Sequence, residues 1–201
     1  EEVEKKDVYD VPDQREHVLW LNHTDDMLME IEAIEDETFM GFFVKRDRIE
    51  QQHKLDTVQK IHRKHSRIII FTRYTEAVEL YREELGTKYV INGKTKDREE
   101  LLKTLAAKET YTLIVQASIS DGWELPDADA IIFIGHSWGF KDLQQSKGRT
   151  IRINNPTETD IYHVMMREGT DEKIWSSLVD KKDFSLAGLS TVQKKELGYI
   201  V

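Results

Sequence analysis

The sequence contains no cysteine, which excludes disulfide bonds and zinc sites built from thiolates. No apolar run approaches the roughly eighteen residues of a membrane span, and no signal peptide is visible. Internal repeats and low-complexity tracts are also absent from the sequence. These absences favour an intracellular protein, which we expect to be cytoplasmic in a prokaryote or virus and nuclear in a eukaryote.

The length of 201 residues suits one α/β domain with an appendage and is sufficient to bury a full core. Because the chain begins with Glu1 rather than methionine, we expect a piece of a longer polypeptide. The net charge of -9 argues against wholesale coating by nucleic acid, but residues 45–67 hold eight Lys and Arg against three acidic residues. This basic stretch could follow a phosphate backbone, or it could be the solvated face of a helix.

Apolar periodicity predicts alternating helices and strands. Helices are predicted at residues 14–34 and 48–64, with a break at Gly41, Phe42 and Phe43 between them. Further along the chain, strands are predicted at 67–72, 88–91, 111–116, 129–134 and 160–166, and helices at 75–85, 96–107, 140–148 and 170–180. This alternation predicts a doubly wound parallel sheet flanked by helices. Residues 184–201 contain few periodic apolar positions and are predicted to form a loosely attached tail.

Two arginines three residues apart, Arg149 and Arg152, follow Gln145 and Gly148 in a stretch that suits a helix or turn near a terminal phosphate. A guanidinium is planar and permanently charged, so it can neutralise charge that develops during phosphoryl transfer. This chemistry predicts an arginine-finger role. A bare pair with this spacing is also common on solvated helix faces.

Two β-branched apolar runs, within residues 112–134, flank a small polar loop. The pattern predicts a buried strand, a loop and a second buried strand, and loops at the carboxyl ends of parallel strands form binding crevices. Gly122 would permit close approach of a ligand, and Glu124 could accept a hydrogen bond from a ribose hydroxyl. The alternative is an ordinary tight connection. Trp123 could stack on a base or simply pack over the loop.

The order of these segments resembles the second RecA-like lobe of superfamily 2 helicases. Residues 118–126 look like motif V of that family, residues 145–152 like motif VI, residues 67–74 like motif IV, and Asn92 to Leu105 like the segment called IVa. Trp138 and residues 169–182 are similar to elements of the Snf-like branch of DNA translocases. The resemblance covers roughly residues 54–183. It departs from the family at Gln116, where Ser or Thr is usual, and at residues 119–120, where Gly-Gly is usual.

The resemblance implies a RecA-like doubly wound parallel sheet over residues 54–183. Residues 1–53 would then be an N-terminal helical appendage or linker from a first lobe, and residues 184–201 a tail. Arg149 and Arg152 would be catalytic, and the nucleotide would contact Gln145, Gly148, Gly122 and Glu124. Nucleic-acid contacts are expected at Thr72, Arg73, Asn92, Gly93, Gln116 and Ser118.

A motor of this family also needs a P-loop, GxxxxGK[ST], and an acidic pair for Mg²⁺. Gly93, Lys94 and Thr95 do not form one, because Lys88 stands where the loop glycine should be; we assign them to a turn. Residues 35–37 are acidic but do not follow an apolar strand. The chain is therefore expected to be half a motor, inactive alone, that closes over ATP and Mg²⁺ bound by an N-terminal RecA-like lobe and grips DNA.

Two alternatives remain open from the sequence. The chain could be a catalytically silent module that docks nucleic acid or protein, or it could be a lobe of an RNA helicase. A metal site is not expected, since His53, His62 and His65 lack further ligands at a useful spacing.

Overall fold

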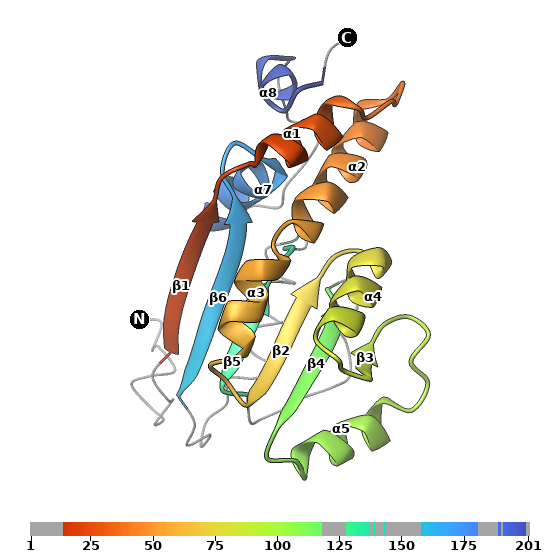
Figure 1. Ribbon diagram of the computed structural model, residues 1–201, viewed down its shortest axis with the longest axis vertical. Coiled ribbons are helices and arrows are strands. Elements are labelled where there is room, and N and C mark those ends of the chain that lie inside the picture. The colour runs from red at the N-terminus through yellow and green to blue at the C-terminus, as the bar shows by residue number, and fades with distance from the viewer. Residues whose placement is uncertain are drawn as a thin grey trace, which may run out of the picture.

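The computed structural model describes residues 14–117, 128–136, 139, 143, 158–180, 189 and 191–199. Its centre is a six-stranded sheet in the order β1-β6-β5-β2-β4-β3, in which every neighbouring pair is parallel (Figure 1). The strands are β1 (Gln14–Leu21), β2 (Arg67–Thr72), β3 (Tyr89–Ile91), β4 (Tyr111–Gln116), β5 (Ala130–Phe133) and β6 (Thr159–Met166). The helices are α1 (Asp25–Glu32), α2 (Phe39–Gln52), α3 (Leu55–His62), α4 (Thr75–Glu84), α5 (Arg98–Ala106), α7 (Thr170–Val179) and α8 (Thr191–Glu196).

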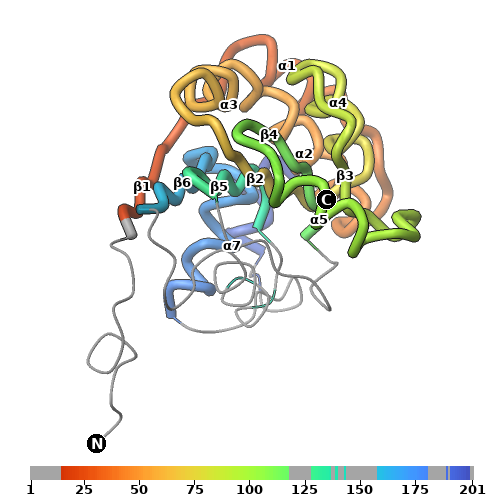
Figure 2. Tube along the Cα trace, turned by 90° about the horizontal axis from the view of Figure 1, so that it is seen from below, coloured from red at the N-terminus to blue at the C-terminus, as the bar shows by residue number. Residues whose placement is uncertain are grey.

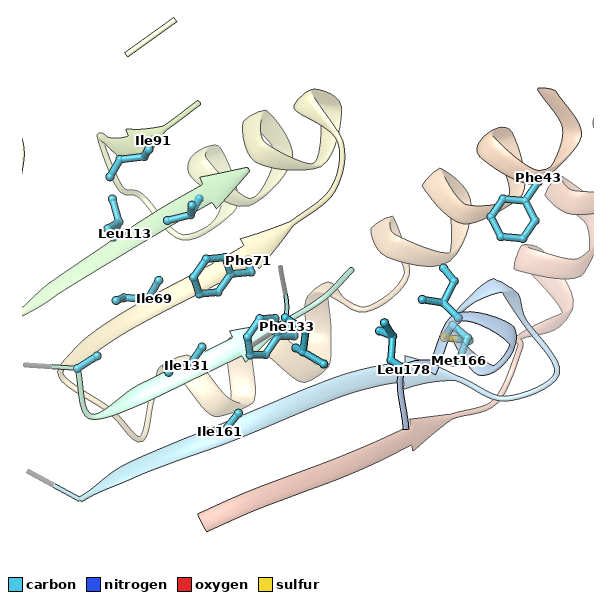
Figure 3. Packing of buried hydrophobic residues seen from close by; sticks show 14 of the residues in the cluster. Phe43, Ile69, Phe71, Ile91, Leu113, Ile131, Phe133, Ile161, Met166 and Leu178 are labelled. Carbon is cyan, nitrogen blue, oxygen red and sulfur yellow. The ribbon is translucent and has the colours of Figure 1, made fainter. Parts of the chain in front are cut away.

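Helices cover both faces of the sheet, with α3 and α4 on one side and α7 on the other (Figure 2). Strand β2 explains why both faces must be covered, because its residues from Ile68 to Thr72 are all buried. Ile68 and Ile70 pack with the side chains of α3 and α4. Ile69 and Phe71 belong to the opposite core, which includes Leu178 of α7 (Figure 3). The alternation follows from the two-residue period of a strand.

Most of the predicted elements from residue 67 onward are confirmed, with boundaries within two residues of the prediction. The doubly wound parallel sheet is therefore the fold of this chain. The predicted helix over residues 140–148 lies, apart from Leu143, outside the described residues. No helix in the described part is long and apolar enough to cross a membrane.

The predicted helix over residues 14–34 is wrong in its first part. Residues Gln14–Leu21 form β1, an edge strand that pairs with β6 and therefore belongs to the sheet and not to a helical appendage. Helix α1 begins only after Thr24, whose hydroxyl accepts a hydrogen bond from the backbone N–H of Met27. The apolar spacing that suggested one long helix includes residues of β1 before the cap and residues of α1 after it.

The predicted break at residues 41–43 is also wrong, because α2 begins at Phe39 and buries Phe42 and Phe43. Packing explains the glycine at position 41, since a Cβ there would lie 2.2 Å from a carboxylate oxygen of Asp36. The single helix predicted over residues 48–64 is two helices, α2 and α3, separated at residues 53–54.

The predicted loose tail is wrong for residues 191–199. These residues form α8 and a short extension in which Leu197 is fully buried. The ring of Tyr199 lies 5.2 Å from that of Phe39 and 5.5 Å from that of Phe42. These two apolar residues and the hydrogen bond from Arg46 to the backbone oxygen of Leu197 attach the segment to α2.

Candidate functional site at the carboxyl edge of the sheet

The parallel strands bring several predicted contact residues to one edge of the sheet. Thr72, the last residue of β2, pairs with Gln116 at the end of β4. Ile91 of β3 pairs with Val115, so Asn92 leaves its strand beside Gln116. The structure therefore brings together the described residues for which nucleic-acid contacts were predicted.

Thr72 is fully buried at this edge. Its hydroxyl donates a hydrogen bond of 2.9 Å to Oε1 of Gln51 in α2. The side chain is thus occupied within the lobe in this structure, and the nucleic-acid contact expected at Thr72 stays a prediction. Only its backbone could serve such a contact.

Arg73 also points inward, with 12% of its side chain exposed. Its Nε donates to the backbone oxygen of His136 at 2.8 Å, and its Nη1 is paired with the buried carboxylate of Asp47. The backbone oxygen of Arg73 accepts a hydrogen bond of 3.5 Å from the side chain of Gln116. Arg73 therefore connects neighbouring segments of the lobe, and the nucleic-acid contact expected at this residue stays a prediction.

Asn92 and Gly93 form an exposed turn after β3. The side-chain oxygen of Asn92 accepts hydrogen bonds from the backbone N–H of Lys94 at 3.0 Å and from the hydroxyl of Thr95 at 3.3 Å. A Cβ at Gly93 would meet no atom within 4 Å. The assignment of Gly93, Lys94 and Thr95 to a turn is confirmed, and the backbone of Gly93 is open to a ligand.

Helix α2 supplies a buried polar face to the same edge. Its Glu50 carboxylate receives hydrogen bonds from Nε of Arg46 at 2.7 Å and from the backbone N–H of Thr170 at 2.9 Å. His23, which follows β1, lies 3.3 Å from the same carboxylate. Glu50 in α2 thus links the segment after β1, through His23, to the beginning of α7, through Thr170.

Lys54 and Asp171 form a second buried ion pair. The Nζ of Lys54 lies 2.5 Å from Oδ2 of Asp171 and 2.7 Å from the backbone oxygen of Ile134. Burial raises the pKa of Asp171; Lys54 opposes this rise, whereas the charges of Asp47 and Glu50 add to it. The pair therefore fixes the residue that follows β5 to the first turn of α7.

Two glycines allow α2 to approach the loops closely. A Cβ at Gly135 would lie 2.8 Å from the side chain of Gln51, and one at Gly169 would lie 2.7 Å from the side chain of Glu50. Contacts this short are essentially never made by a real Cβ, so larger residues would displace the polar side chains. The polar face of α2 is matched to the segments that follow β5 and β6.

The comparisons with known proteins agree with this architecture. Residues 53–154 match the helicase conserved C-terminal domain. The chain belongs to this family. Two curated relatives are the SWI/SNF-related matrix-associated actin-dependent regulator of chromatin subfamily A-like protein 1 of Xenopus tropicalis, 25% identical over 139 residues, and that of Xenopus laevis, 26% identical over 139 residues. Each alignment covers 65% of this chain but only 15% and 14% of the respective relative, so the chain spans a small part of their length.

Solved structures confirm the RecA-like fold of the helicase lobe. The Sulfolobus solfataricus SWI2/SNF2 ATPase core in complex with dsDNA superposes with a TM-score of 0.65 and 16% identity, over 96% of this chain and 52% of that chain. The C-terminal part of the Fun30 ATPase domain superposes with a TM-score of 0.53 and 20% identity, over 82% of this chain and 55% of that chain. The family match therefore places the chain among helicase C-terminal domains, and the structural likenesses show that it has their RecA-like fold.

Several predicted site residues of the helicase lobe lie outside the described residues. They include the two catalytic arginines, the four nucleotide-contacting residues and one strand-end serine, namely Arg149, Arg152, Gln145, Gly148, Gly122, Glu124 and Ser118. Their predicted roles stay predictions. The described chain reaches Ala117, whose backbone N–H bonds to the oxygen of Thr72 at 2.7 Å, immediately before the motif V segment.

The basic stretch over residues 45–67 is not one continuous surface for phosphates. Arg46 and Lys54 are buried in ion pairs, and Lys45 contacts Asp36 and the backbone oxygen of Glu35. Both interpretations of this stretch, a phosphate-binding stripe and a solvated face, are wrong for the two buried cations. The signal that could have found them is the spacing of polar residues after the buried Phe43. These residues lie on one face of α2, at positions 46, 47, 50 and 51, and the spacing continues to Lys54 just beyond the helix.

The histidines considered for metal binding have other partners. His53 bonds to Glu30, His62 to the hydroxyl of Thr112 and His65 to the hydroxyl of Tyr162. Burial lowers the pKa of both His62 and His65. Within the described ranges, no three metal-ligating side chains come together.

Glu50 should make the stability of the helicase lobe pH-dependent. Burial alone would raise its pKa, but the hydrogen bond with His23 and the charge of Arg46 lower the pKa of Glu50 from 4.5 to about 2. Because the folded-state pKa is the lower one, this stabilisation is present above pH 4.5 and is lost as the pH falls towards 2. The stability advantage of the wild type over Glu50→Gln should therefore shrink by about 3 kcal/mol across that window. Denaturant titrations at a series of pH values measure it, and a pH-independent difference would contradict the assignment.

Proposed function

We propose that this lobe belongs to an ATP-dependent DNA translocase and that it supplies Arg149 and Arg152 to ATP and Mg²⁺ bound by an N-terminal RecA-like lobe. In the same proposal, the loops at the carboxyl edge of the sheet grip the backbone of the DNA. Closure of the two lobes would place the guanidinium groups against the phosphates, where charge increases in the transition state. Repeated closure and opening would then move the lobe along the strand.

The observation that carries the proposal is the convergence of motif segments on one sheet edge. The ends of β2, β3 and β4 lie side by side there, and the turn at Gly93 leaves its backbone open. In parallel α/β sheets, ligands bind outside the carboxyl ends of the strands. The Sulfolobus ATPase core was solved in complex with dsDNA, which favours DNA over RNA as the partner. Comparing ATP hydrolysis by the full-length protein with DNA, with RNA and without nucleic acid tests this choice.

The 201-residue chain alone is expected to release phosphate from ATP only at the background rate. Its sequence lacks the GxxxxGK[ST] loop, and arginines cannot replace the backbone amides and metal-binding carboxylates of a phosphate site. Purified chain incubated with ATP, Mg²⁺ and DNA provides the measurement. Turnover that co-purifies with the chain through successive columns would overturn the half-motor proposal.

Weak DNA binding by the chain should depend on the turn after β3. Lys94 and Lys96 are exposed there, whereas Lys64 is exposed beside the opposite, amino edge of the sheet. Each lysine that contacts a phosphate releases counterions, so Lys94→Gln and Lys96→Gln should each reduce the slope of log affinity against log salt by about 0.7–0.9. Lys64→Gln is the matched control and should leave the slope unchanged.

The measurement is a fluorescence titration of single- and double-stranded DNA at several salt concentrations. A larger effect of Lys64→Gln than of the two strand-end variants would move the DNA contact to the basic 45–67 stretch. Absence of binding at low salt would remove the DNA-gripping role from the isolated lobe.

A further inference from the structure

Arg73 joins three segments of the carboxyl edge. Its guanidinium bonds to Asp47 in α2 and, through Nε at 2.8 Å, to the backbone oxygen of His136. Its own backbone oxygen accepts the hydrogen bond from Gln116, the last residue of β4. Arg73 therefore contacts Gln116, which precedes the motif V segment in the sequence. It also contacts His136, after which the sequence continues towards motif VI.

The partner of Arg73 in α2 is itself held in place. Asp47 is fully buried, and its other carboxylate oxygen accepts a hydrogen bond of 2.9 Å from the hydroxyl of Thr170. The tight contacts at Gly135 and Gly169 further restrict any shift of α2 relative to the loops. Asp47 is thus a fixed point from which Arg73 can orient other groups.

The strands that lead into Arg73 and His136 are also packed against each other. The rings of Phe71 and Phe133 stack with centroids 5.0 Å apart and an interplanar angle of 13° (Figure 3). Phe71 lies two residues before Arg73, and Phe133 lies three residues before His136. Because the strands are closely packed, we expect loss of the Arg73 contacts to displace the residues that follow the strands more than the strands themselves.

A guanidinium suits this position better than an ammonium. It is planar and offers several N–H groups in a fixed fork, so it can bond to a carboxylate and a carbonyl oxygen in different directions at once. Burial would lower the pKa of Arg73, but the neighbouring Asp47 carboxylate keeps it above its ordinary value. The side chain therefore stays charged at physiological pH.

We infer that Arg73 is a positioning residue of the motor, which holds the end of β4 at Gln116 and the segment after β5 at His136 in a fixed relation to each other. Its guanidinium does so through Asp47 and His136, and its backbone oxygen accepts the hydrogen bond from Gln116. The inference rests on the proposed function, since these segments lead to the expected ATP and DNA contacts. Arg73 would accordingly affect the rate of hydrolysis without touching either ligand.

The test compares Arg73→Met, Arg73→Lys and the double variant Asp47→Asn/Arg73→Met in the full-length protein. The double variant removes both charges, so it avoids the buried unpaired carboxylate that could prevent Arg73→Met from folding. Arg82→Met is the matched control, because Arg82 pairs at the surface of α4 with Glu79 and Glu83. Steady-state ATP hydrolysis is measured at saturating DNA, with thermal unfolding to find the folded fraction of each variant.

A misplacement of about 1 Å can cost on the order of 100-fold in rate, so kcat of the folded double variant should fall by about 10- to 100-fold. The KM for ATP and the affinity for DNA should stay within about twofold, and Arg73→Lys should recover only part of kcat because it loses the fork. A folded double variant with the kcat of Arg82→Met would overturn the inference. So would an intact kcat combined with weakened, less salt-dependent DNA binding, which would mean direct phosphate contact.

The proposed function can fail separately from this inference. If the wild-type full-length protein shows no DNA-stimulated hydrolysis, the proposed function is wrong and the inference is wrong with it. If the wild type is stimulated by DNA and Arg149→Ala abolishes that activity, while the folded double variant matches the wild type, only the positioning role is wrong.

Discussion

Arg149→Ala and Arg152→Ala should each lower DNA-stimulated ATP hydrolysis by the full-length protein about a thousandfold or more. The expected loss is large because an arginine finger stabilises charge that is greater in the transition state than in bound ATP. Lysine at either position should rescue poorly, since an ammonium keeps the charge but loses the planar fork. The KM for ATP should change much less than kcat.

Steady-state kinetics, with circular dichroism to confirm folding, measures this effect. Arg82→Ala provides a matched control, because it removes the same side chain from an exposed ion pair with Glu79. If Arg149 and Arg152 make only surface ion pairs, their replacement should cost at most about 1 kcal/mol of stability and leave turnover near the control. Wild-type turnover in both variants would remove the main catalytic assignment.

The sheet could be predicted from the sequence because parallel strands buried on both faces are continuous apolar runs. Strands β2, β4 and β5 have this character, and their positions were predicted within a residue. Strand β1 differs because it lies at the edge, where Val18 is 42% exposed and His17 faces Tyr162. Its mixed composition permitted a helical interpretation, and only the pairing with β6, far along the chain, decides between the two structures.

The candidate site was predictable in location but not in the role of each side chain. Parallel strands must bring their carboxyl ends together, so the grouping of Thr72, Asn92 and Gln116 followed from the element order. The direction of the Arg73 side chain could not be predicted in this way, because it depends on Asp47 in α2. The apolar periodicity had placed the boundaries of that helix wrongly. A cation in a sequence is ordinarily expected to be solvated, and its burial becomes visible only with its tertiary partner.

The same dependence on a distant partner makes Lys54 a sensitive position for stability. Lys54 is fully buried against Asp171, which lies 117 residues further along the chain. Lys54→Met should lower the free energy of unfolding by about 3–5 kcal/mol, because it leaves the Asp171 carboxylate buried without its cation and near Asp47 and Glu50. Denaturant unfolding of the 201-residue chain, monitored by circular dichroism, gives this value.

The control for Lys54→Met is Lys60→Met, the same substitution at an exposed position of α3, which should change stability by less than about 0.5 kcal/mol.

Adding Asp171→Asn to Lys54→Met should restore much of the loss in the free energy of unfolding. The amide removes the unpaired charge, and its oxygen can still accept the hydrogen bond that Asp171 receives from the backbone N–H of Met166 at 2.9 Å. The loss in Lys54→Met should also shrink at low pH, because the pKa of Asp171 is already raised and protonation removes its charge. Equal stabilities of Lys54→Met and Lys60→Met at neutral pH would mean that water or local rearrangement neutralises the carboxylate, and that the pair does not hold the segment after β5 against α7.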